Sequence, residues 1–187
     1  MFFYTCIHFC CRQKILWAKY YTTMNKLALQ ITIIIMGLFS LNFSSQGTCK
    51  VYKGSSNYSS DIICTLKDSK IYKGTSTYSS DILVTIKNGK IYQKNSSYSS
   101  DVLYSISDGK VYKGNSTYNS DVVCTIRDGK MYKGNSTYSS DILCNWKGDG
   151  KVYRGTSSYS SDILYTLSDV ATISEFFAIW YVVNYVY

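Results

Sequence analysis

The sequence predicts an all-β protein whose short antiparallel strands come from six hairpin repeats and close into a ring or shallow barrel. Each repeat holds two runs rich in β-branched and aromatic residues, separated by turn-forming residues, which is the pattern of a hairpin. Six such hairpins supply about twelve strands. The 20-residue unit recurs from Lys50 onward, with copies that begin at Lys50, Lys70, Lys90, Lys110, Lys130 and Lys151.

Each copy contains a predicted hairpin tip. A two-residue type I′ turn needs positive φ at both central positions, and Asn-Gly and Asp-Gly tolerate this best. The fifth copy departs from the rule, because it has one inserted residue between Lys147 and Lys151. Three copies have the favoured dipeptides at this place: Asn88-Gly89, Asp108-Gly109 and Asp128-Gly129.

A two-residue tip also fixes the register of the strands that it joins. Around the third tip Ile106 should face Val111, and Tyr112 should lie on the opposite face of the sheet. By alternation we expect Val102, Tyr104, Ile106 and Val111 to share the core face. The outer wall should then be rich in tyrosine.

The second connection of each copy, such as residues 114–121, consists mainly of Ser, Thr, Asn and Gly. Such residues bond their own backbone and favour turns. A meander of short strands must hide its edges, and closure into a ring or barrel does so completely. An open ring is the alternative.

The last segment leaves the repeat pattern. Thr172 and Glu175 have the spacing of a capping box, and residues 173–187 contain almost no polar side chain. A helix that is apolar on all sides must be buried, so we expect residues 171–187 to form a hydrophobic helix packed inside the β domain of residues 48–170. A final pair of strands is the alternative, because Tyr, Val, Ile and Trp also favour strands.

The N-terminal part reads as targeting sequence. A short basic start, an apolar run and a small polar stretch follow one another over residues 24–47, as in a secretory signal peptide. Residues 1–23 have no such order, and we interpret them as an extension before a true start at Met24. An uncleaved anchor is the alternative, because the apolar run is only slightly shorter than the ~20 residues that span a bilayer.

The repeats resemble those of a known family. Tandem units of the form K-[IV]-Y-x-G-x-S-x-Y-S-S-D, followed by the hydrophobic tail TISEFFAIWY, are similar to the β-flower repeat proteins. That resemblance implies hairpin petals arranged around a central axis. The architecture is in turn similar to Tubby-like barrels, in which antiparallel strands close around a hydrophobic C-terminal helix. No lipid-headgroup motif of the Tubby-like family matches here, so its phosphoinositide binding is not carried over.

No group of residues predicts catalysis, a metal site or a cofactor. The single histidine, His8, lies in the predicted extension, and a repeated Ser without a neighbouring base is not a nucleophile. Each copy offers one Asp beside Ser residues, which favours a turn over a calcium loop. Cys64, Cys124 and Cys144 share a repeat position with Val84 and Tyr residues, so we expect free buried thiols. The chain is therefore predicted not to be an enzyme.

The charges suggest one candidate site. Without residues 1–47 the chain keeps 16 basic and 12 acidic side chains, net +4, which is too weak for a nucleic-acid binder. Basic side chains gather at the hairpin tips, where closure would form a candidate anion-binding rim. Aspartates share these tips, so a merely solvated surface is the competing interpretation. The rim residues are Lys67, Lys70, Lys87, Lys90, Arg127, Lys130, Lys147 and Lys151.

Together these features predict an exported, monomeric, non-enzymatic binding or structural module of the cell envelope or exterior. The alternative is a Tubby-like barrel that binds anionic lipid surfaces through its basic hairpin tips. The expected partner of the protein is an anionic lipid or glycan surface. We expect it to bind no nucleic acid and no cofactor.

The signal-peptide interpretation makes a direct prediction. Exported protein should begin near Gln46 or Thr48, because small residues at Ser45 and Gly47 fit a signal-peptidase site. Intact-mass analysis of the exported chain checks this. A mass that still includes residues 24–45 would contradict it.

Overall fold

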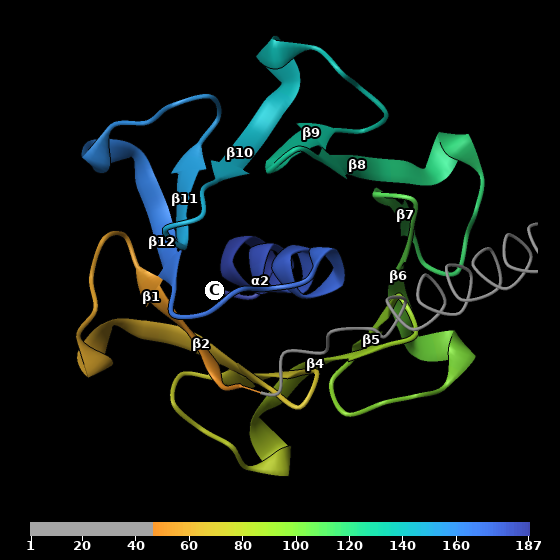
Figure 1. The fold of residues 1–187 in the computed structure, drawn as a ribbon. Helices are drawn as coiled ribbons and strands as arrows, with labels where there is room; N and C mark the ends of the chain where they lie inside the picture. The colour runs from red at the N-terminus through yellow and green to blue at the C-terminus, as the bar shows by residue number, and fades with distance from the viewer. Residues whose placement is uncertain (1–46) are drawn as a thin grey trace, which may run out of the picture. The chain divides into compact units, whose positions relative to one another are not determined.

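The computed structural model describes residues 47–187, and every structural statement below concerns that part of the chain. The predicted extension (1–23) and signal peptide (24–47) fall outside it, apart from Gly47, and stay predictions. In the described part, strands form a ring around a central helix (Figure 1). The predicted fold class is confirmed.

The strands are β1 (Cys49–Lys53), β2 (Ile62–Lys67), β3 (Lys70–Lys73), β4 (Ile82–Lys87), β5 (Lys90–Gln93), β6 (Val102–Ser107), β7 (Lys110–Lys113), β8 (Val122–Arg127), β9 (Lys130–Lys133), β10 (Ile142–Trp146), β11 (Lys151–Arg154) and β12 (Ile163–Leu167). The helices are α2 (Ile173–Tyr185) and the short 3₁₀ helices η1 (Ser59–Asp61), η2 (Ser79–Asp81), η3 (Ser99–Asp101), η4 (Asn119–Asp121), η5 (Ser139–Asp141) and η6 (Ser160–Asp162).

The ring is closed. Each strand pairs with its sequence neighbours, and β12 returns to pair with β1. At this seam Val51 lies opposite Leu167, and the main-chain N–H of Lys50 donates to Ser168 Oγ at 2.8 Å. No strand of the ring keeps an open edge, which decides between the closed and the open arrangement.

The hairpin tips have the predicted geometry. Asp108 and Gly109 both have positive φ, at 50° and 72°, and Ile106 lies opposite Val111 as expected. The tip also contacts the next repeat, because the N–H of Ile126 donates to the Gly109 carbonyl at 2.6 Å. A Cβ on Gly109 would lie 2.5 Å from the Ile126 carbonyl oxygen. Glycine therefore allows both the turn and the close approach of consecutive hairpins.

One part of the register prediction is wrong. The second strand of each copy contains a bulge that shifts the pairing. In β6 the bulge is at Leu103, so that Tyr92 lies opposite Val102 while Ile91 lies opposite Tyr104. Leu103 and Tyr104 both pack against the inner core, but Val102 does not. Simple alternation fails here because the extra residue of a bulge moves the preceding residue, Val102, to the opposite face of the sheet. In the next copy the N–H of Gly114 donates to the Leu103 carbonyl at 2.8 Å.

The long connection of each copy forms a petal, which is the loop from the first strand through the 3₁₀ helix to the second strand. The petals project outward around the ring (Figure 1). Each folds back over the outer face of the sheet, as shown by the bond from Ser105 Oγ to the Ser116 carbonyl at 2.8 Å. The tyrosine-rich outer wall is therefore covered. Its buried members are Tyr72, Tyr92, Tyr112, Tyr132 and Tyr153.

Helix α2 fills the inside of the ring. Its first turn has the predicted capping box, since Thr172 Oγ1 accepts from the N–H of Glu175 and the Glu175 carboxylate accepts from the N–H of Thr172. Burial of Phe176, Phe177 and Ile179 is worth ~1.5–3 kcal/mol for each side chain. The helix ends at Tyr185, two residues before the predicted end. Within residues 47–187 no helix has the length and hydropathy to cross a bilayer.

The three repeat cysteines are free and buried, as predicted. Burial raises the pKa of each thiol from 9.0 to about 12. Tyr165, in the same repeat position, is fully buried, and burial raises its pKa well above the usual range. Its hydroxyl has no hydrogen-bond partner within the described part of the chain. The position is thus an apolar layer of the core. Its occupants are Cys64, Val84, Tyr104, Cys124, Cys144 and Tyr165.

Two glycine substitutions test the packing of consecutive hairpins. Gly109→Ala should lower the free energy of unfolding by about 1–3 kcal/mol, because it combines positive φ with a clash against Ile126. Gly148→Ala, in the fifth tip, is the matched control, because a Cβ there meets nothing within 4 Å. Urea unfolding measures both. Equal midpoints would contradict this tip geometry.

The buried thiols predict how stability changes at alkaline pH. The unfolded chain ionises these cysteines near pH 9, whereas the folded chain keeps them protonated to about pH 12. Their contribution to stability is therefore complete below pH 9 and decreases as the pH rises towards 12. We expect a variant with Val at Cys64, Cys124 and Cys144 to lose less stability over this interval, measured as urea midpoints. Parallel curves for the two proteins would contradict the assignment.

Candidate functional site

The hairpin tips gather at one end of the barrel. Antiparallel strands alternate in direction, so all tight tips lie at one end and all petals at the other. The cross-strand pairs are those predicted: Lys67 lies opposite Lys70, Lys87 opposite Lys90, and Arg127 opposite Lys130. The structure thus brings the predicted residues to a common end, which we call the rim.

The rim carries the net positive charge of the described chain. By strand position it has ten basic and five acidic side chains, whereas the petals have six of each sign. The rim set is Lys50, Lys67, Lys70, Lys87, Lys90, Lys110, Arg127, Lys130, Lys147 and Lys151, with Asp68, Asp108, Asp128, Asp149 and Asp169. The petal set is Lys53, Lys73, Lys94, Lys113, Lys133 and Arg154, with Asp61, Asp81, Asp101, Asp121, Asp141 and Asp162.

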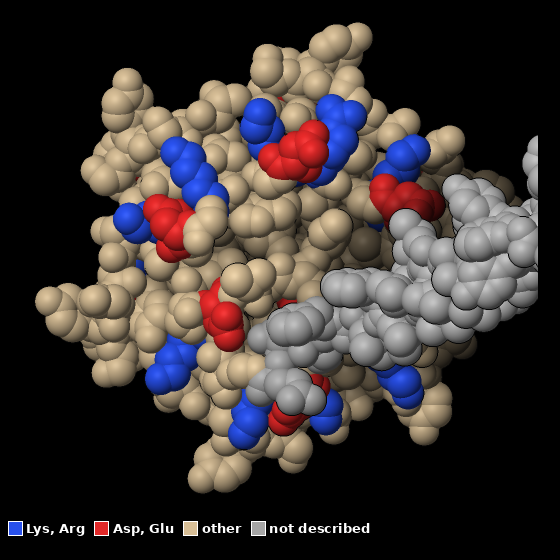
Figure 2. All heavy atoms as spheres, in the orientation of Figure 1, with Lys and Arg blue, Asp and Glu red and all other residues tan. Residues whose placement is uncertain are grey.

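The charges of the rim are mixed locally. Figure 2 shows this face, where basic and acidic side chains lie together in clusters around the centre of the ring. Arg127 Nε lies 3.5 Å from an Asp128 carboxylate oxygen, and Lys151 Nζ lies 3.7 Å from one of Asp149. These pairs are exposed and contribute little to stability. They reduce the positive potential without cancelling it.

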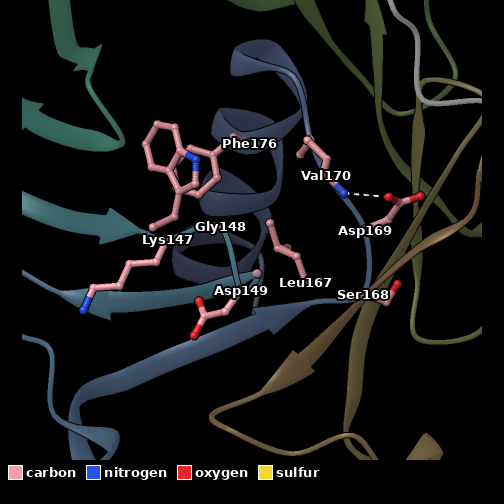
Figure 3. A pocket seen from close by; sticks show the side chains of 11 residues that line it. Lys147, Gly148, Asp149, Leu167, Ser168, Asp169, Val170 and Phe176 are labelled. Atoms are coloured by element: carbon pink, nitrogen blue, oxygen red, sulfur yellow. Dashed lines mark hydrogen bonds between the residues drawn. The ribbon is translucent and has the colours of Figure 1, made fainter.

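A cavity of ≈ 410 Å³ opens between the fifth tip and the segment that joins β12 to α2, residues 168–172. We call this segment the strap. On one wall Trp146 stacks on Phe176, with ring centroids 4.0 Å apart. Figure 3 shows Phe176 and the strap residues around the cavity. The inserted residue makes this tip longer than the others, and the strap departs from the ring beside it. The cavity therefore lies where the repeat pattern is broken.

The charged groups around this cavity already have partners. Lys147 Nζ lies 4.7 Å from the centroid of the Tyr153 ring, and Asp149 pairs with Lys151. Asp169 Oδ1 accepts from the N–H of Val170 at 2.7 Å (Figure 3). What remains is a recess with an aromatic wall, which can take an apolar group.

The repeated Ser and Asp of the petals form hydrogen bonds with one another. In each copy the Ser hydroxyl donates to the Asp carboxylate, as Ser56 does to Asp61 at 2.5 Å and Ser157 to Asp162 at 2.6 Å. The same Ser oxygen accepts from a main-chain N–H two residues later, as in Tyr58. These hydrogen bonds explain why the repeated Ser and Asp stabilise the turn of each petal, as predicted. Within residues 47–187 no three His, Cys, Asp or Glu side chains are grouped as a metal site.

Sequence reasoning missed the apolar part of the rim. In the strap Val170 is 81% exposed, and Ile173 at the start of α2 is 44% exposed. Val170 lines the recess beside the charged residues of the fifth tip. The only sequence signal is two apolar residues beside the capping box, and such residues are normally assigned to the core.

Comparison with known proteins supports the repeat assignment. The family model described as 6-fold beta flower protein matches residues 45–124 and, in a second overlapping match, residues 91–179. Comparisons with curated proteins and with solved structures gave no match. The two family matches span all six repeats and more than half of the sequence, and the ring has the petals that such a family implies. The chain therefore belongs to the 6-fold beta flower protein family.

Proposed function

We propose that this chain is an exported, non-enzymatic binding module whose rim docks on an anionic lipid surface. The observation that carries the proposal is the separation of charge between the two ends of the barrel: the rim holds the excess of basic side chains, and the petals are balanced. A positive ring facing a negative membrane gains about 1 kcal/mol for each basic residue near the surface.

The pairing of like charges supports a role beyond solubility. Lys67 and Lys70 lie directly opposite each other, as do Lys87 and Lys90. Such cross-strand pairs destabilise a hairpin, and a purely solvated tip would not need them. An anionic surface would relieve this repulsion when the rim binds.

The strap supplies apolar contact on the same face. Val170 lines the recess beside Trp146 and is exposed, and Ile173 at the start of α2 is exposed as well. Peripheral membrane binding commonly combines basic residues with a few apolar side chains that enter the headgroup region. The aspartates of the tips keep the attraction moderate, so binding should be sensitive to salt.

Export is the other part of the proposal. It rests on the signal-peptide order of residues 24–47. An exported module would meet the outer surface of a membrane, and anionic headgroups there would be the groups that the rim binds. The rim needs no cofactor for this role.

Co-sedimentation with liposomes tests the docking. We expect purified exported protein to sediment with vesicles of anionic lipid at low salt, and much less at high salt or with neutral lipid. Replacing Lys67, Lys87 and Lys130 by Gln should abolish most binding. The matched control replaces Lys53, Lys73 and Lys113 at the petal end by Gln, which removes the same charge and should leave binding nearly intact.

Two results would contradict the proposal. One is equal or absent sedimentation in all four combinations of lipid and salt. The other is equal weakening by the rim and petal variants, which would show that overall charge, rather than the rim, drives adsorption.

A further inference from the structure

Each petal presents one tyrosine to solvent in the same way. These petal tyrosines are between 72% and 75% exposed, in contrast to the tyrosines that the petals cover. Their backbone conformation is nearly constant, with φ from −81° to −80° and ψ from 140° to 144°. The petal tyrosines are Tyr58, Tyr78, Tyr98, Tyr118, Tyr138 and Tyr159.

Hydrogen bonds hold each petal tyrosine from both sides. In the second petal the N–H of Tyr78 donates to Ser76 Oγ at 3.2 Å, and its carbonyl accepts from the N–H of Asp81 at 3.0 Å. Ser76 Oγ in turn donates to Asp81 Oδ2 at 2.5 Å. The ring is therefore presented on a fixed backbone, which lowers the entropy lost when a ligand binds.

The fold does not account for the tyrosine itself. The Ser and Asp of each petal recur in all copies because they hold the loop, whereas the residue before the tyrosine varies among Asn, Thr and Ser. The tyrosine recurs as strictly as the Ser and Asp. Yet within residues 47–187 no petal tyrosine ring stacks on another aromatic ring or pairs with a cation. Contact with an external ligand would explain why the tyrosine recurs in every petal.

The surroundings of the ring indicate the class of ligand. The second petal is hollowed beside Tyr78, in a cavity of ≈ 680 Å³ lined by residues 73–78 and Asp81. Most of these side chains carry hydroxyl groups, and each petal is close to neutral. A flat aromatic face among hydroxyl groups suits a sugar ring, which has an apolar C–H face and polar edges.

We propose that the six petals are equivalent subsites for a neutral carbohydrate polymer. A polymer repeats one unit, as the petals do, so that several petals bind one chain or surface and weak sites add up to useful avidity. A protein partner fits less well, because protein interfaces need a contiguous desolvated centre. Each petal tyrosine is instead surrounded by a loop that is rich in hydroxyl groups. This site lies on the petals and is separate from the rim.

Native affinity electrophoresis tests the proposal. The exported protein is run through gels that contain hydroxyethyl cellulose, laminarin, galactomannan or glycol chitin, and through a gel without polysaccharide. We expect retardation in at least one of the four. Replacing all six petal tyrosines by Ala should abolish it, and replacing three alternate ones should weaken the apparent affinity by about tenfold or more.

Three controls make the result specific. Phe at all six positions keeps the ring face and should retain most of the retardation. Ala at the variable position before each petal tyrosine changes side chains that are also exposed and should have little effect; these residues are Asn57, Thr77, Ser97, Thr117, Thr137 and Ser158. An unchanged urea midpoint of the six-Ala variant shows that the fold is intact, and its unchanged liposome binding separates the petals from the rim.

Either of two results would overturn the proposal. One is free migration of the unmodified protein in all four polysaccharides. The other is retardation that the six-Ala variant keeps in full, which would place carbohydrate binding elsewhere on the chain.

Discussion

Closure of the ring at the β1–β12 seam is the constraint on which the other features depend. A sheet of short repeated strands has two edge strands whose main-chain N–H and C=O groups are unpaired. Pairing β1 with β12 gives both edges their hydrogen-bond partners. Closure encloses a space that the strands alone do not fill, so a hydrophobic segment must enter it. The apolar helix α2, capped by Thr172 and Glu175, is that segment. The strap leads directly from β12, which closes the ring, to α2, which fills it. The strand and the helix are therefore placed by neighbouring parts of the chain.

The same closure separates two chemical surfaces. Antiparallel pairing sends every tight tip to one end and every petal to the other, so each repeated side chain is multiplied in a ring rather than scattered. At the tips this gives an excess of positive charge around a strap that exposes Val170. At the petals it gives neutral, hydroxyl-rich loops that each expose one ring. Repetition thus turns weak single contacts into arrays, which favours extended ligands over small molecules.

Much of the fold could be predicted because repetition makes a single local rule apply many times. The Asp108-Gly109 turn fixed one register, and the same rule held in the other two-residue tips. The bulge at Leu103 could not be predicted, because nothing in an apolar run shows where an extra residue is inserted. For the same reason Val102 was placed on the wrong face. The rim followed from register alone, whereas the exposure of Val170 and of the petal tyrosines depends on how loops fold over the sheet.

Hydrogen exchange of the main-chain amides at the β1–β12 seam tests whether the ring is closed in solution. In a closed ring the amides of β1 and β12 that pair across the seam, such as those near Val51 and Leu167, are as protected as amides in β6 and β7. We therefore expect exchange rates of the same order at both places. Fast exchange confined to β1 and β12, with slow exchange elsewhere in the sheet, would show an open edge and contradict it.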